Sequence, residues 1–258
     1  MAQKYLDPTG LSYFWSKIKE RLGLKVDKED GKGLSTNDYT TEDKNKLDNI
    51  ISITTGEIDT ICGETIELPD YLGFTAEKEN STVAMAVTGT PTQGQVFETS
   101  TNKLSWTTFT PGTTTITLSN IGDKVYFRGN NTTVNEAFKI YHNFTMTGKI
   151  AASGNIMSLL DKTCESLTLL DTSCCFFCLF KDCTSLTTAP TLPATTLSYY
   201  CYSNMFEGCT NLTVAPELPA TTLVNYCYHY MFYKCTNLAV APELPATILA
   251  PYCYKFMF

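Results

Sequence analysis

The chain has 258 residues, a formal net charge of −7 and 43% hydrophobic residues. The length suffices for one large domain or for two or three small ones, and the hydrophobic content excludes a disordered chain. The acidic charge argues against a nucleic-acid or anionic-membrane partner, because both require a basic surface. No apolar run approaches the roughly 18 residues of a membrane span, so we expect no membrane insertion.

Charge and cysteine content change along the chain. Residues 1–50 carry nine acidic and nine basic side chains, whereas residues 151–258 carry seven acidic and four basic ones and ten of the eleven cysteines. The odd number of cysteines argues against a disulfide framework. We therefore predict a multidomain chain with these parts: an N-terminal helical attachment segment at 1–50, a linker at 51–71, a sandwich-like β domain at 72–148 and a repeat region at 149–258.

The N-terminal segment contains one helical stripe of apolar residues. Its members are spaced three, four, seven and eleven residues from the first, as on one face of a helix. They are Leu11, Phe14, Trp15, Ile18 and Leu22. A helix of this length is not stable alone, so the stripe must pack on something. We favour docking on a partner protein, and packing within the chain's own domain is the alternative.

The middle of the chain alternates polar and apolar residues with period two. Runs at 82–87, 114–118 and 124–127 are separated by turn residues such as Gly89, Pro111 and Gly122. Short strands at this spacing predict a small β-sandwich or barrel, with Trp106 as a core anchor. No catalytic constellation is visible here, so we expect neither an enzyme nor a cofactor.

The C-terminal region repeats with a period of 26 residues, and segments 197–222 and 223–248 are identical at 18 of 26 positions. A fixed period in this range predicts a solenoid. Cys201, Met205, Phe206 and Cys209 fall on one helical face, which predicts a short helix in each repeat. Leu212 and Val214 predict a short strand after it.

The cysteines recur in two series within the repeats. Cys201 and Cys209 are eight residues apart, unlike the paired ligands of a zinc site. Stacked rows of small apolar side chains explain the recurrence, because free cysteine packs as a small hydrophobe. We favour such buried rows over disulfides or a metal site, and predict no bound metal.

Differences between repeats suggest a binding surface, because positions that vary within an array usually face solvent. Six of the eight differences between 197–222 and 223–248 lie on or beside the expected helix. Variation of surface residues without any function is the alternative explanation. The strand side of the solenoid, around Thr213, is an alternative binding surface. The candidate binding residues are Tyr199, Asn204, His229, Tyr230 and Tyr233.

The run MFEGCTNLTVAPELPATTL resembles the BspA-like leucine-rich repeat. That resemblance implies a right-handed α/β solenoid, used for adhesion or protein interaction and without catalysis. Segment 149–170 is expected to be a degenerate cap, with repeats from 171 and an incomplete last one. With Tyr252 and Phe258 uncovered, we expect the array to continue.

The N-terminal sequences YLDPTGLSYFWSKIKERL and VDKEDGKGLSTNDYTTEDKNKLDNI resemble segments of bacteriophage tail-fibre and head-fibre proteins from gut Bacteroidales phages. This resemblance implies a virion protein that docks on capsid or tail proteins through its N-terminus and assembles as a homotrimer. Its repeats would then bind a host-surface protein or glycan.

Two other classes of protein, a bacterial surface adhesin and a polysaccharide depolymerase, remain open. A bacterial cell-surface adhesin should begin with a signal peptide or lipid anchor, and MAQKYLDPTG has neither layout. A depolymerase should show a clustered carboxylate pair, and none of the 26 acidic residues forms a convincing one.

Overall fold

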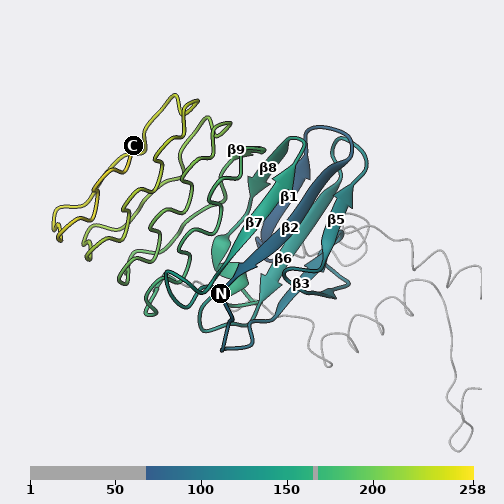
Figure 1. The fold of residues 1–258 in the computed structure, drawn as a ribbon, viewed down its shortest axis with the longest axis horizontal. Coiled ribbons are helices and arrows are strands. Elements are labelled where there is room, and N and C mark those ends of the chain that lie inside the picture. The colour runs from purple at the N-terminus through teal and green to yellow at the C-terminus, as the bar shows by residue number, and fades with distance from the viewer. Residues whose placement is uncertain (1–67, 165–167) are drawn as a thin grey trace, which may run out of the picture. The chain divides into compact units, whose positions relative to one another are not determined.

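The computed structural model describes residues 68–164 and 168–258, and residues 69–258 form one compact unit (Figure 1). The predicted N-terminal helix, including Phe14 and Trp15, lies outside the described residues. Within them the secondary structure is strands apart from one short 3-10 helix. The elements are β1 Leu72–Ala76, β2 Ser81–Thr88, β3 Phe97–Ser100, β4 Thr107–Phe109, β5 Thr115–Leu118, β6 Lys124–Gly129, β7 Tyr141–Thr147, β8 Ile150–Ser153, η1 Ile156–Leu159 and β9 Leu186–Thr188.

The strands form two sheets. The six-stranded sheet has the order β4-β3-β6-β1-β8-β9, and the three-stranded sheet has the order β5-β2-β7. Neighbours are antiparallel except β8 and β9, which are parallel. The strands predicted at 82–87, 114–118 and 124–127 correspond to β2, β5 and β6, and those three predictions are confirmed.

A shared aromatic core joins the two sheets. Phe144 of β7 lies edge-to-face with Phe74 of β1 and Phe127 of β6, at ring-centroid distances of 4.9 and 5.2 Å. All three side chains are completely buried. The alternating pattern read from the sequence thus directs one face of each sheet into a common interior.

Residues 171–258 form what we call the repeat stack, in which successive coils lie side by side (Figure 1). We number the coils 1 (171–196), 2 (197–222), 3 (223–248) and 4 (249–258). Backbone hydrogen bonds join each coil to the next at equivalent positions. For example, the amide of Phe180 donates to the Met205 carbonyl at 2.9 Å, and the amide of Phe206 donates to the Met231 carbonyl at 2.9 Å.

In the first half of each coil, every fourth residue has a left-handed backbone conformation with positive φ, and we call these residues corners. In coil 2 the corners are Tyr200, Asn204 and Gly208, with φ of 57°, 58° and 73°. The equivalent positions of the other coils also have positive φ. Across the four coils ten of these residues are not glycine: Cys174, Cys178, Asp182, Tyr200, Asn204, Tyr226, Tyr230, Lys234, Tyr252 and Phe256. A left-handed conformation costs roughly 1–2 kcal/mol per non-glycine residue, so the hydrogen bonds and packing between coils must hold these corners in place.

The predicted fold class is therefore wrong. The segments expected to be helices, such as 201–209, are chains of turns, and the one helical element in the described residues is η1. The error has a physical cause, because a coil with a corner every four residues buries positions i, i+4 and i+8. Cys201, Met205 and Cys209 have that spacing and are fully buried, but their amides donate to carbonyls three residues back, as in isolated turns, rather than four residues back as in an α-helix.

The strand predicted at Leu212–Val214 is reduced to isolated parallel bridges, Thr188 to Val214 and Val214 to Val240. Only coil 1 forms a named strand there, β9, which pairs in parallel with β8.

A row of phenylalanines begins in the sheets and runs through the repeat stack. Phe144 stacks on Phe180, followed by Phe206, Phe232 and Phe258, with centroid spacings from 5.2 to 5.8 Å and interplanar angles of 1° to 16°. The Phe144 amide also donates to the Leu179 carbonyl at 2.7 Å. Strand β7 thus covers the first coil, together with β8 and residues 155–156. The division predicted between residues 148 and 149 stays a prediction, and these contacts cross it.

Candidate binding face

The cysteines have a structural role in the repeat stack. The Cys183, Cys209 and Cys235 thiols donate to the carbonyls of Phe144, Phe180 and Phe206 at 2.9 to 3.0 Å. Burial raises the pKa of Cys175 to about 11 and that of Cys227 to about 12. All ten cysteines in the described residues are free, and no group of three or more potential ligands there could hold a metal ion. The thiols therefore contribute packing and hydrogen bonds.

Aromatic side chains gather over the first half of the coils. Tyr200 stacks on Tyr226 at 4.4 Å and Tyr226 stacks on Tyr252 at 4.8 Å. Phe138, from the loop before β7, extends this row by an edge contact to Tyr200 at 4.4 Å. The rings occupy left-handed corners, which place their side chains on the outside of the coil. The corner positions thereby build a row along the stack.

The five residues predicted from the sequence lie in or beside this row. Tyr199, 43% exposed, meets the Tyr200 ring edge-on at 4.4 Å. His229 meets the Tyr226 and Tyr230 rings at 5.3 and 4.4 Å, and Tyr230 meets Tyr233 at 5.0 Å.

Asn204 is held by polar contacts beside the rings. Its amide nitrogen donates to Glu207 at 2.6 Å, and its oxygen accepts from the Ser203 hydroxyl at 2.7 Å. Ser203 in turn lies 3.5 Å from the Nδ1 of His229. Asn204 is therefore linked to the ring cluster rather than isolated from it.

Sequence comparison between repeats missed part of this surface. Tyr200 and Tyr226 are identical in the two repeats, so a search for varying positions passes over them. The available signal was a tyrosine recurring at the position before Cys201, Cys227 and Cys253. We call the complete set the aromatic face: Tyr199, Tyr200, Asn204, Tyr226, His229, Tyr230, Tyr233, Lys234, Tyr252, Lys255 and Phe256.

Electrostatics on the aromatic face follow from partial burial. Burial, with the neighbouring Tyr199 and Tyr226 hydroxyls, raises the pKa of Tyr200. Burial and the nearby Lys255 ammonium lower the pKa of His229 below 6.5. Both shifts favour the uncharged form of the side chain, at Tyr200 and at His229.

Lysines supply the charge on this face. Lys181 of coil 1 pairs with Glu207. Lys234 lies 5.2 Å from the centroid of the Tyr233 ring, and Lys255 lies 5.0 Å from that of Tyr252. Neither lysine forms an ion pair with a described residue.

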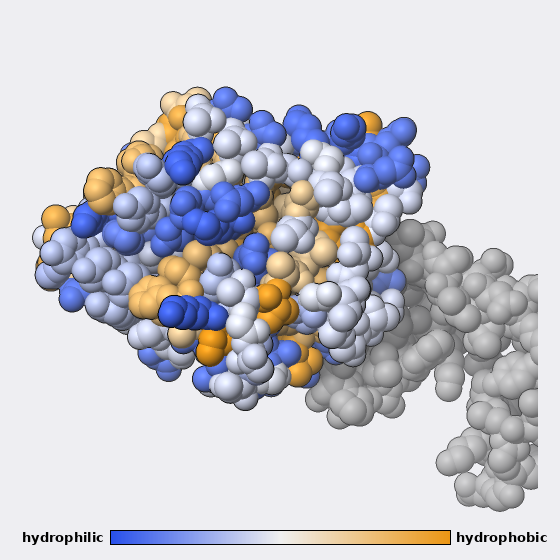
Figure 2. Space-filling model, in the orientation of Figure 1, coloured by the Kyte–Doolittle hydropathy of each residue, from blue (hydrophilic) through white to orange (hydrophobic). Residues whose placement is uncertain are grey.

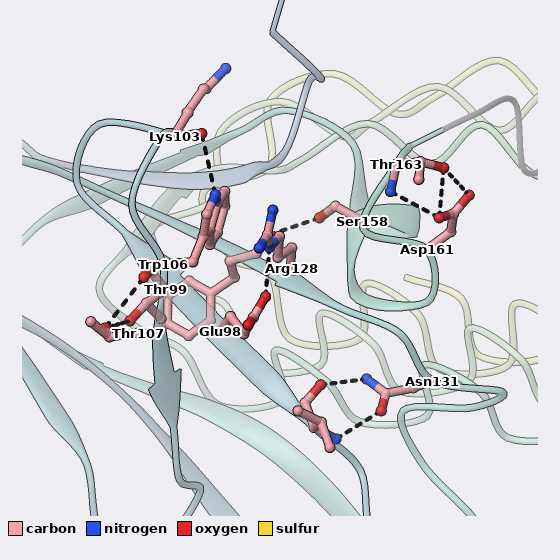
Figure 3. Close-up of polar contacts among 12 residues, drawn as sticks. Glu98, Thr99, Lys103, Trp106, Thr107, Arg128, Asn131, Ser158, Asp161 and Thr163 are labelled. Carbon is pink, nitrogen blue, oxygen red and sulfur yellow. Dashed lines mark hydrogen bonds and ion pairs between the residues drawn. The ribbon is translucent and has the colours of Figure 1, made fainter. Parts of the chain in front are cut away.

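A second aromatic cluster lies on the six-stranded sheet (Figure 3). Trp106, predicted as a core anchor, is half-buried and outside the core, so that prediction is wrong. Its ring lies 4.0 Å from the Arg128 guanidinium, and its Nε1 donates to the Lys103 carbonyl at 3.2 Å. Arg128 is also bound to Glu98 at 2.7 Å. Because these charges are already partnered, this cluster is a weaker candidate than the aromatic face.

The described residues contain no helix that is both long and apolar enough to cross a membrane. The predicted docking residues Leu11, Phe14, Trp15, Ile18 and Leu22 lie outside the described residues. On the side turned to the viewer in Figure 2, apolar patches are small and separated by hydrophilic residues. Searches for similar proteins found no matching family model, curated protein or solved structure.

Proposed function

We propose that this protein is a non-enzymatic attachment protein of a bacteriophage virion, in which the repeat stack binds the surface of the host cell. In this proposal the N-terminal segment docks on a capsid or tail protein, and the assembled protein is a homotrimeric fibre. The likeness of residues 1–50 to phage fibre proteins motivates the viral assignment.

The aromatic face is the observation that carries the binding role. Its rings lie on the outside of the coils, where Tyr199 is 43% exposed and Tyr200, Tyr226, Tyr230 and Tyr233 are half-buried. Tyrosine combines a large rigid contact area with a polar hydroxyl and loses little conformational entropy on binding. Such residues dominate recognition surfaces. The interior rows already hold the coils together, so these exposed rings are free to contact a ligand.

The test is binding of fluorescently labelled protein to a panel of gut Bacteroidales strains, with and without changes to the aromatic face. Tyr230→Asn introduces the residue that occupies the equivalent left-handed corner at Asn204. Tyr233→Gln removes a second ring. We expect the double variant to lose at least tenfold in affinity for any strain that binds the original protein.

A matched control uses the other side of the coils. Val214 and Val240 are 56% and 62% exposed, and the equivalent residue in coil 1 is Thr188. Val214→Thr with Val240→Thr should leave cell binding unchanged. Equal loss in both variants, or no loss in the tyrosine variant, would contradict a binding role for the aromatic face.

A further inference from the structure

The outward chemistry of the aromatic face indicates a hydroxyl-rich ligand. Tyr200 and Tyr226 are parallel within 9°, and Tyr226 and Tyr252 within 21°. Within this row each ring covers the face of its neighbour, and the Tyr200 hydroxyl lies next to the hydroxyls of Tyr199 and Tyr226. Phenol hydroxyls both donate and accept hydrogen bonds, and here they recur once per coil. A ligand with hydroxyl groups along its length fits this row better than an apolar one.

The charge distribution indicates that this ligand is acidic. In coils 3 and 4 the first half of each coil contains Lys234 and Lys255 and no acidic residue. The exposed acids Glu217 and Glu243 lie in the return segments of coils 2 and 3. Although the whole chain carries −7, charges beyond about 8 Å are largely screened at physiological salt. Glu207, which hydrogen-bonds Asn204 and acts on His229, is paired with Lys181, so Lys234 and Lys255 are the charges of the face without an ion-pair partner among the described residues.

The position of these lysines suits a ligand lying along the stack. Lys255 lies 5.0 Å from the Tyr252 ring centroid and 5.2 Å from that of Phe256. Lys234 lies beside Tyr233 in the preceding coil. Cation–π contacts of this kind hold an ammonium group near a ring while leaving its hydrogens available. Lys255 therefore borders the row of Tyr200, Tyr226 and Tyr252, and Lys234 lies beside the Tyr230–Tyr233 pair of the aromatic face.

We propose that the aromatic face binds an acidic polysaccharide, a chain of sugars bearing carboxylate groups. The tyrosine hydroxyls of successive coils would contact sugar hydroxyls, and Lys234 and Lys255 would contact the carboxylates. This inference rests on the proposed function and specifies its ligand.

The repeats supply substitutions that remove each charge without a foreign residue. Lys234→Gly introduces the residue found at Gly208, where φ is also positive, and Lys255→Ser introduces the residue found at Ser203. Lys124→Ser with Lys162→Gly removes two lysines outside the aromatic face and serves as the control.

The experiment measures affinity of the full chain for three probes by isothermal titration or biolayer interferometry. The probes are polygalacturonate as the carboxylate polymer, amylose as a neutral polymer and dextran sulfate as a generic polyanion. We expect binding to polygalacturonate, at least tenfold weaker binding to the other two, and weakening with added salt. Exposed charge pairs contribute about 0.2–1 kcal/mol each, so the double lysine variant should bind polygalacturonate about two- to thirtyfold more weakly.

Equal binding to amylose, or an unchanged affinity in the double lysine variant, would overturn the acidic ligand. Binding to dextran sulfate as tight as to polygalacturonate would also overturn it, as would an equal loss in the control. If the lysine variant kept its binding to host cells while Tyr230→Asn with Tyr233→Gln lost it, the proposed function would stand and this inference would fail.

Discussion

The two-sheet region and the repeat stack bury their side chains by different rules. In the two sheets, strands of up to eight residues pair mainly antiparallel, and alternate residues face a mixed aromatic core. In the stack, short segments join left-handed corners, and each buried position contacts its own equivalent in the next coil. The core of the sheets is thus built from different residues that fit one another, and the core of the stack from the same residue type repeated in each coil. Repetition fixes the interior and leaves the outward corners free to differ.

The difference also appears in the polar groups that each region buries. In the sheet region, buried Asn135 donates to the His142 and Phe177 carbonyls and accepts from the His142 amide. In the stack, the buried Tyr202 and Tyr228 hydroxyls have no hydrogen-bond partner. Among the described residues of the sheet region the comparable unpaired atom is Gln95 Oε1, so the stack leaves a repeated phenol unpaired and the sheets leave a single amide oxygen.

The largest predicted difference concerns alkaline pH. Nine of the ten described cysteines lie in the stack, and burial raises the pKa values of eight of them, for example to about 11 for Cys235 and about 12 for Cys178. Unfolded thiols lose their protons near pH 9, so the unfolded state binds fewer protons above that pH. Stability should therefore be constant below about pH 8 and fall as the pH rises from 9 to 12, by about 1.4 kcal/mol per unit for each thiol.

Urea unfolding at pH 7, 9 and 10, followed by circular dichroism, measures this loss. A variant with Cys201→Ala and Cys227→Ala should be less stable at pH 7 and less sensitive to alkali. A flat stability profile up to pH 10 would show that the thiols are not buried as described.

The next prediction compares two fully buried phenylalanines, Phe206 in the stack and Phe127 in β6. Replacement of either by alanine should cost about 3–5 kcal/mol through lost burial and a cavity. Because each coil contacts only its neighbours, Phe206→Ala should reduce hydrogen-exchange protection mainly in coils 1 to 3. Phe127→Ala should reduce protection throughout both sheets. Equal loss of protection in β2 for the two variants would remove the distinction between the regions.

A smaller effect is expected when one thiol hydrogen bond is removed. Cys209→Ala leaves the buried carbonyl of Phe180 without the thiol donor and creates a small cavity, which should cost about 1–3 kcal/mol in urea unfolding. The equivalent change at half-buried Cys235 should cost less, because water can replace the lost donor there. The opposite ranking would contradict the assigned role of these thiols.

The smallest effect has the opposite sign. Tyr202→Phe removes a buried hydroxyl that has no partner, and Phe176 already occupies this position in coil 1. We expect unchanged or increased stability, by up to about 1 kcal/mol, in thermal or urea unfolding. A loss above 1 kcal/mol would show that the hydroxyl has a hydrogen-bond partner after all.

The sequence predicted three of the strands, β2, β5 and β6, but not the backbone of the repeats. Alternation located β2, β5 and β6 because each strand buries one face and exposes the other. The spacing of Cys201, Met205 and Cys209 fits both a helix and a coil with four-residue corners, so periodicity could not separate them. Tyrosine at a left-handed corner is intrinsically unfavourable, and only the hydrogen bonds between coils make that conformation stable.

The candidate site was predicted in part for a related reason. Tyr230 and Tyr233 were found because the two repeats differ there. Tyr200 and Tyr226 were missed because they are identical and resembled core positions. The position of Phe138 beside Tyr200 depends on the contact between the sheets and the first coil, which no local pattern encodes.

The most direct test of the account asks which of the two regions contacts the ligand. An NMR titration of isotope-labelled protein with surface polysaccharide from a bound strain compares tyrosine ring signals of the stack with the Trp106 indole signal. The account predicts shifts for Tyr200, Tyr226 and Tyr230 and none for Trp106. Shifts at Trp106 with unchanged signals from the three tyrosines would contradict it and would place recognition on the six-stranded sheet.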